Sequence, residues 1–126
     1  MSETDVTAEE RLRAARRGAW ALRNNSGAFK DETGRLVRYG LGNDSKRING
    51  VFKSADLIVC EPVIITEDMI GQVIGQFLGL ECKKAGWKYT GTDREVAQKR
   101  FLDKLWELGG RGYFTDGTTW IDSRAV

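Results

Sequence analysis

The spacing of apolar and polar residues divides the chain into short strands and two long helices. Residues 3–17 are highly charged with few apolar positions and predict a first helix, which Ser2 can cap and Gly18 can end. Strands are expected where apolar residues run together or alternate with polar ones. The segments that meet this criterion in the first half of the chain are 19–22, 28–29, 36–39, 57–60 and 63–65.

Two connections in this half have recognisable signals. The sequence Asp-Glu-Thr-Gly at 31–34 is typical of a turn, so we expect segments 28–29 and 36–39 to form a hairpin. Residues 40–53 are polar and rich in Gly and Asn, and we interpret them as a loop.

Residues 72–83 predict a longer strand, whose side chains would alternate between two faces. One face would enter the core and consists of Ile74, Leu78, Leu80 and Cys82. The other face is depleted of bulk by glycine and ends in Glu81 and Lys83. In this interpretation Cys82 is a buried small apolar residue and not a reactive thiol.

A second helix is predicted after this strand. Thr92 and Glu95 form a capping box, apolar residues recur at helical spacing, and the Gly-Gly pair at 109–110 ends the helix. Short strands at 113–114 and 119–121 follow, around an Asp-Gly turn. The order of elements indicates one domain over residues 1–126, of the α/β or α+β class.

Composition excludes several kinds of site. The 126 residues contain no histidine, which excludes Ser-His and Cys-His nucleophiles and imidazole-ligated zinc. Cys60 and Cys82 are the only cysteines, too few for a disulfide framework or a four-thiolate metal site. We find no signal peptide and no apolar run that could span a bilayer, and therefore expect a protein of the reducing cytoplasm without a membrane partner.

Charge is distributed unevenly although the net charge is only +2. Residues 11–53 carry eleven Lys and Arg against three acids, whereas residues 54–82 carry five acids and no base. Such runs are often solvated surface. They are also what a phosphate-binding wall beside a carboxylate metal site would require.

One constellation has a specific chemical logic: Asp56 before one apolar strand, and Glu81-Cys82-Lys83 at the end of another. Two carboxylates on neighbouring strands, with the Cys82 backbone carbonyl, supply the oxygen ligands that Mg²⁺ or Mn²⁺ prefers. Lys83 can hold or deprotonate a metal-activated water that attacks a phosphodiester. The alternative is that Glu81 and Lys83 form an ordinary surface ion pair.

Several motifs together resemble the VRR-NUC domain, the virus-type replication-repair branch of the PD-(D/E)XK nuclease superfamily. They lie over residues 19–115, in the family's order, and comprise Arg23-Asn24-Asn25 with Gly27-Ala28, Tyr39-Gly40-Leu41, Lys53-Ser54-Ala55-Asp56-Leu57-Ile58, Glu81-Cys82-Lys83 and Ala97-Gln98 with Gly109-Gly110. The resemblance implies a restriction-endonuclease-like mixed sheet flanked by helices and metal-dependent DNA cleavage. It also implies a stand-alone phage domain in a bacterial host, often a homodimer that acts on branched DNA such as Holliday junctions.

Carried over by position, the resemblance makes Asp56 and Glu81 metal ligands and Lys83 the catalytic lysine. Gln98 matches the family's glutamine and would orient the water or a nearby phosphate, although a solvated helix glutamine is an equal alternative. The superfamily often adds a glutamate from the first helix. The candidates for it are Glu10, which we prefer, and Glu3 or Glu9.

Polar and basic residues around these motifs are candidate DNA contacts. They are Arg23, Asn24, Asn25, Lys53, Lys84 and Lys88, with Lys46 and Arg47 as further lysine and arginine candidates. For each lysine a role in surface solubility is an equal interpretation. Trp87 is the tryptophan we expect to touch substrate. The alternative to an endonuclease is a nuclease-fold protein that binds DNA or a protein partner without cleavage.

Overall fold

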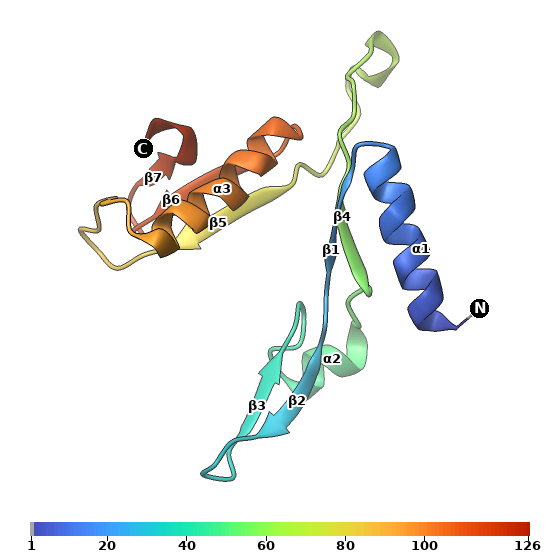
Figure 1. Cartoon of the computed structure of the whole chain (residues 1–126), viewed down its shortest axis with the longest axis vertical. Helices are drawn as coiled ribbons and strands as arrows, with labels where there is room; N and C mark the ends of the chain where they lie inside the picture. The colour runs from blue at the N-terminus through green and yellow to red at the C-terminus, as the bar shows by residue number, and fades with distance from the viewer. Residues whose placement is uncertain (1) are drawn as a thin grey trace. The chain divides into compact units, whose positions relative to one another are not determined.

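The computed structural model describes residues 2–126 and shows a mixed α/β fold with small sheets and three α-helices (Figure 1). The chain forms two compact units, the first running up to Val59 and the second from Cys60 to Val126. The elements of the first unit are α1 (Glu3–Arg16), β1 (Trp20–Arg23), β2 (Gly27–Lys30), β3 (Leu36–Tyr39), α2 (Lys46–Val51) and β4 (Leu57–Cys60), whose last residue is counted with the second unit.

Helix α1 confirms the helix predicted at the start of the chain. The Ser2 hydroxyl accepts a hydrogen bond from the Asp5 backbone N–H, and the Asp5 carboxylate accepts one from the Ser2 N–H in return. Gly18 follows with a φ of 76°, a left-handed conformation in which glycine is favoured. Ala14 is the buried residue of the helix, and the helix contacts β1.

The predicted hairpin is also confirmed. β2 and β3 pair antiparallel, with Gly27 opposite Tyr39. The Asp31 carboxylate stabilises the turn by accepting hydrogen bonds from the backbone N–H groups of Thr33 and Arg35. At the open end the buried Asn43 amide donates to the carbonyls of Gly27 and Tyr39, which satisfies both strands at once.

The prediction of a loop over residues 40–53 was wrong in part. Residues Lys46–Val51 form the short helix α2, whose first turn is capped by the Ser45 hydroxyl accepting from the Ile48 N–H. The composition concealed this helix because Gly and Asn dominate the stretch around it. The signal that could have found it is the serine directly before the helical turn.

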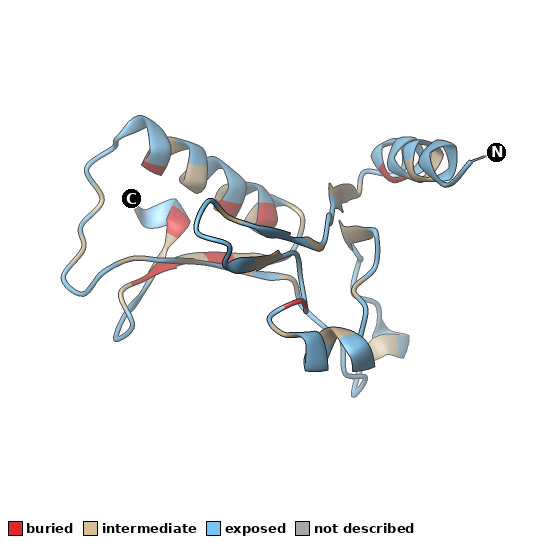
Figure 2. Cartoon of the chain, turned by 90° about the horizontal axis from the view of Figure 1, so that it is seen from below, coloured by how far each residue is buried: buried red, intermediate tan, exposed pale blue. Residues whose placement is uncertain are grey.

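The second unit is a three-stranded sheet covered on one face by a helix. Its strands are β5 (Leu78–Cys82), β6 (Arg111–Thr115) and β7 (Trp120–Asp122), in the order β5-β6-β7. β5 and β6 run parallel and β6 and β7 antiparallel, and α3 (Asp93–Glu107) connects β5 to β6. The core lies between α3 and β6 (Figure 2), where Phe114 and Leu105 are fully buried and Leu102 nearly so.

Two glycines set the distance between α3 and this sheet. Gly79 of β5 and Gly112 of β6 are paired across the parallel strands and both face the helix. A Cβ on Gly79 would lie 2.6 Å from Leu105 Cδ1, and a Cβ on Gly112 would lie 2.6 Å from the Leu102 carbonyl oxygen. The leucine side chains at Gly79 and the helix backbone at Gly112 therefore lie closer to the strands than a larger residue would allow.

The strand predicted over residues 72–83 was correct in kind but too long, and its two faces were assigned the wrong way round. Only Leu78–Cys82 is strand, and within the fully described stretch 61–77 the one regular element is the 3-10 turn Glu67–Met69, so segment 63–65 is not a strand. Gly79 and Glu81 face α3, whereas Leu78 and Leu80 remain 38% and 41% exposed.

Cys82 lies on the same face as these leucines and is exposed, which contradicts its prediction as a buried residue. The apolar side chains suggested the buried face, but the face that contains Gly79 is the one on which a helix can pack closely.

Candidate functional site

Three residues of the predicted site form a hydrogen-bonded chain in the second unit. Lys83 Nζ donates to Gln98 Oε1 over 2.7 Å, and Gln98 Nε2 donates to Glu81 Oε1 over 3.0 Å. All three side chains are half-buried. Gln98 therefore bridges an ammonium and a carboxylate, and its amide orientation is the one that satisfies both.

Strand and helix each place part of this chain. Glu81 and Lys83 are two residues apart at the end of β5, so their side chains leave the same face of the strand as Gly79. Gln98 lies four residues before Leu102 on α3 and shares its helix face. The close approach of α3 at Gly79 brings this glutamine to the strand end.

Aromatic rings border Lys83 on another side. Its Nζ lies 5.5 Å from the centre of the Trp87 ring and 6.0 Å from that of Phe114. Both distances are within the range of a cation–π interaction. The ammonium is thus held by the Gln98 amide and by two ring faces.

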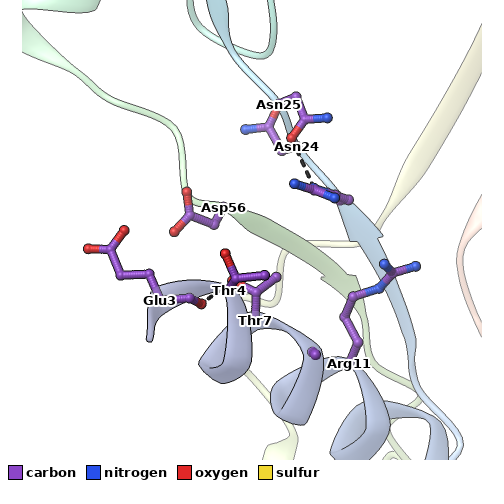
Figure 3. A pocket seen from close by; sticks show the side chains of 9 residues that line it. Glu3, Thr4, Thr7, Arg11, Asn24, Asn25 and Asp56 are labelled. Atoms are coloured by element: carbon purple, nitrogen blue, oxygen red, sulfur yellow. Dashed lines mark hydrogen bonds between the residues drawn. The ribbon is translucent and has the colours of Figure 1, made fainter. Parts of the chain in front are cut away.

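Asp56 lies in the first unit, directly before β4, and lines a pocket of about 260 Å³ (Figure 3). Its backbone position is well defined because its carbonyl accepts a hydrogen bond from the Asn24 N–H at the end of β1. The Asn24 amide also donates to the Ser54 hydroxyl and the Ala55 carbonyl, at 2.7 and 2.8 Å. The Asp56 side chain itself is exposed.

The pocket combines acidic and basic side chains from α1, β1 and the start of β4. Glu3 extends from the first turn of α1 on the side of the pocket where Asp56 lies (Figure 3). Arg11 and Arg23 also line the pocket. Two carboxylates beside two guanidinium groups can bind a cation and a phosphate together.

The first-helix glutamates differ in their surroundings. Glu3 lines the pocket with Asp56. Glu9 and Glu10 instead form ion pairs with Arg13, at 3.5 and 2.9 Å. The geometry therefore favours Glu3 over the preferred candidate Glu10, although the two lie seven residues apart on one helix.

The candidate DNA contacts fall into two groups. Arg23 and Asn25 line the pocket and are joined by a hydrogen bond from Arg23 Nε to Asn25 Oδ1. Asn24 lines it too, but its amide is engaged with the 54–55 backbone and side chains, which gives it a structural role. Lys53 donates to Asn49, while Lys84 and Lys88 are exposed in the second unit.

Asp56, Glu3 and Glu81 offer carboxylate oxygens, which are the type of ligand that a hard divalent cation prefers. Cys82, whose backbone carbonyl is a further candidate ligand, closes β5 next to Glu81. Across residues 2–126 the structure contains no group of three or more His, Cys, Asp or Glu side chains gathered closely enough to hold a metal. Asp56 belongs to the first unit and Glu81, Lys83 and Gln98 to the second.

Glu95 is a functional candidate that the sequence interpretation used only as a helix cap. Its carboxylate accepts a hydrogen bond from Trp87 Nε1 over 2.9 Å, in addition to bonds from the residues of the cap. The sequence signal available for this contact was a capping glutamate, Glu95, eight residues after Trp87. Only the fold of the intervening turn shows that the two meet.

No family model, no curated protein and no solved structure matches this chain. Among the described residues, none of the helices is both long and apolar enough to cross a membrane.

Proposed function

We propose that the chain is a Mg²⁺- or Mn²⁺-dependent DNA endonuclease with a restriction-endonuclease-like PD-(D/E)XK core. The observation that carries this proposal is the chain from Lys83 through Gln98 to Glu81. A lysine held beside a carboxylate by a bridging amide is suited to hydrolysis of a phosphodiester, which needs a cation binder and a proton-handling group side by side.

The roles of the residues follow from their chemistry. Asp56, Glu81 and the Cys82 carbonyl would hold the cation, which when bound would neutralise charge that develops on the phosphate. Lys83 would orient the attacking water and accept or release its proton. Gln98 would hold the Lys83 ammonium and the Glu81 carboxylate in their relative positions while the DNA binds.

The first unit would supply the grip on the DNA backbone. Arg11 and Arg23 line the pocket that contains Asp56, and guanidinium groups bind phosphate oxygens through paired hydrogen bonds. The basic character of residues 11–53 extends this surface. Binding is therefore expected to weaken steeply with salt, because several phosphates would release counterions together.

Cleavage of labelled linear, flap, fork and four-way-junction DNA tests the proposal. We expect cutting with Mg²⁺ or Mn²⁺ and none with EDTA, with branched substrates cut faster than linear duplex. Binding to these DNAs without cleavage in either metal would instead support the alternative, a nuclease-fold protein that binds DNA. If the chain neither binds nor cleaves these DNAs, the remaining candidate is a protein that binds a protein partner.

Branched substrates imply a particular assembly. A four-way junction needs two symmetric cuts, and each chain carries one candidate catalytic set, so two chains in a C2 homodimer are the simplest arrangement. Light scattering at micromolar concentration should then show twice the chain mass of 14.1 kDa. A monomer that stays monomeric on DNA would contradict paired cutting and leave a nicking or flap-cutting enzyme.

A further inference from the structure

The indole of Trp87 is fixed in the second unit by contacts on its edge and its face. Its Nε1 donates to Glu95 Oε2 over 2.9 Å. The ring packs on Phe114, with centroids 4.8 Å apart and planes tilted by 31°, and meets Tyr89 nearly edge-on. Since Phe114 is fully buried, the indole rests on the core of the unit.

A tight turn brings this ring back towards the strand end. The Trp87 N–H donates to the Lys84 carbonyl over 3.1 Å, which closes a four-residue turn directly after Lys83. Gly86, the third residue of that turn, has a φ of 78°. Glycine is favoured there because other residues rarely adopt a positive φ.

Glu95 is anchored far more firmly than a helix cap requires. Its Oε1 accepts from the N–H and hydroxyl of both Thr90 and Thr92, at distances between 3.0 and 3.2 Å. That leaves Oε2 for the Trp87 indole. The side chain is only 6% exposed, and hydrogen bonds, the one from the Thr92 backbone first, lower the pKa of Glu95 to about 2.

From this geometry we propose that Trp87, anchored by Glu95, is a positioning residue that holds the Lys83 ammonium beside Gln98. The inference rests on the proposed function, in which Lys83 handles a proton. It assigns Trp87 a different task from the substrate contact expected from the sequence. The indole face lies towards Lys83 Nζ, while its N–H and its other contacts belong to the protein.

Without the indole, only the more distant Phe114 ring would restrain the lysine on that side. A lysine side chain has four rotatable bonds and loses considerable entropy when held in one place. The hydrogen bond to Gln98 is a single contact, and Gln98 is shared with Glu81. The indole face, at 5.5 Å the nearer of the two rings, adds a restraint that uses none of the lysine's hydrogen-bond donors.

The direct test is NMR of the protein alone, without DNA or metal. The Lys83 Hε resonances, assigned by their loss in Lys83→Met, should be displaced upfield by ring currents and show NOEs to the indole protons. Trp87→Phe keeps a ring but loses the N–H to Glu95, so we expect a smaller displacement. Trp87→Leu should remove the NOEs and most of the displacement.

A control variant separates this effect from general loosening of the unit. Trp120→Phe changes the same atoms at an exposed indole of β7 and should leave the Lys83 resonances unchanged. If Trp87→Leu fails to fold, Trp87→Phe carries the comparison. Lys83 resonances that match the wild type in a folded Trp87→Phe or Trp87→Leu would overturn the proposal.

Cleavage kinetics provide a second readout. Misplacing Lys83 should lower kcat roughly tenfold or more in Trp87→Leu, with KM for DNA unchanged and partial recovery in Trp87→Phe. A raised KM with unchanged kcat would overturn the proposal and return Trp87 to substrate contact. If the NMR effects appear in a protein that cuts no DNA, the nuclease proposal fails while the positioning of Lys83 by Trp87 stands.

Discussion

The two units hold their acidic side chains in opposite ways. In the second unit the Glu81 carboxylate is half-buried and hydrogen-bonded to Gln98, which in turn is bonded to Lys83. In the first unit Asp56 and Glu3 are exposed around an open pocket, and it is the Asp56 backbone that is fixed. A connected, half-buried chain is ordered before any ligand arrives, whereas exposed carboxylates keep their rotamer freedom until a ligand orders them.

This contrast assigns different tasks to the two sets of residues. Groups that must act on a reacting atom benefit from being ordered in advance, because misplacement by about 1 Å is costly in rate. Groups that capture a cation or phosphate tolerate a looser arrangement and lose their rotamer freedom only when the ligand binds. Variants of Lys83 and variants of the exposed Asp56 and Glu3 should therefore differ in which kinetic constant they change.

The largest effect that leaves DNA binding intact is expected from Lys83→Ala. It removes the ammonium of the ordered chain, so cleavage should fall by about 10²–10⁴-fold while junction binding is retained. Single-turnover cleavage and a gel-shift titration measure the two properties separately. The control is Lys104→Ala, which removes a lysine from the last turn of α3. Wild-type cutting by the Lys83 variant would show that the site is assigned wrongly.

Neutralising either carboxylate ligand should abolish both metal binding and activity. Asp56→Asn and Glu81→Gln each replace a charged oxygen donor by an amide of the same shape. Mn²⁺ binding followed by electron paramagnetic resonance gives the affinity, and cleavage gives the activity. Glu81→Gln should also loosen Lys83, because Gln98 loses its charged acceptor. Undiminished Mn²⁺ binding in both variants would contradict the ligand assignment.

A smaller effect should distinguish the glutamates of α1. Glu3→Gln should reduce cleavage roughly tenfold by weakening the pocket's hold on the cation, whereas Glu10→Gln should change it little. The measurement is cleavage rate against Mg²⁺ concentration, with the midpoint shifted upwards for Glu3→Gln. The reverse order of the two variants would restore Glu10 as the first-helix ligand.

The smallest effect concerns stability in acid. Glu95 has its pKa lowered from 4.5 to about 2 in the folded protein, so the unfolded chain takes up a proton first as the pH falls. Its contribution is therefore complete above about pH 4.5 and is lost progressively towards pH 2. Urea unfolding of Glu95→Gln should show a flatter pH dependence over this window.

The matching cap in the first unit sharpens this prediction. Asp5 caps α1 at an exposed position, and its pKa is lowered by hydrogen bonds from the Ser2 backbone first and the Ser2 side chain second. Asp5→Asn should flatten the acid dependence less than Glu95→Gln does. Asp116, whose pKa is also about 2, contributes in the same window and is left unchanged in both variants. An equal or larger effect of Asp5→Asn would show that the additional hydrogen bonds to Glu95 add nothing to its cap.

Local signals predicted most of the elements, because each depends on residues close in sequence. Ser2 and Gly18 bounded α1, the Thr92–Glu95 capping box located α3, and the turn at Asp31 located the hairpin. The same approach missed α2, because propensity within a glycine-rich stretch says little about a single helical turn.

The candidate site was predictable in part. The spacing of Glu81 and Lys83 placed both on one strand face, and the resemblance named Gln98 on the following helix. The hydrogen bonds that join the three were not predicted. The face of β5 that packs against α3 was not predicted, because a row of leucines indicates burial more strongly than a glycine does. The contact from Trp87 to Glu95 depends on a turn and a helix start meeting in space, which no periodicity reports.

The paired glycines beneath α3 keep the distance between the helix and the two strands short. Gly112 lets the helix backbone lie directly against β6, and Gly79 leaves room on β5 for the Leu105 and Leu102 side chains, so the gap that Gln98 must bridge stays short. An amide side chain of modest length can then reach both Glu81 and Lys83. The geometry of the chain from Lys83 through Gln98 to Glu81 therefore depends on two positions that have no side chain.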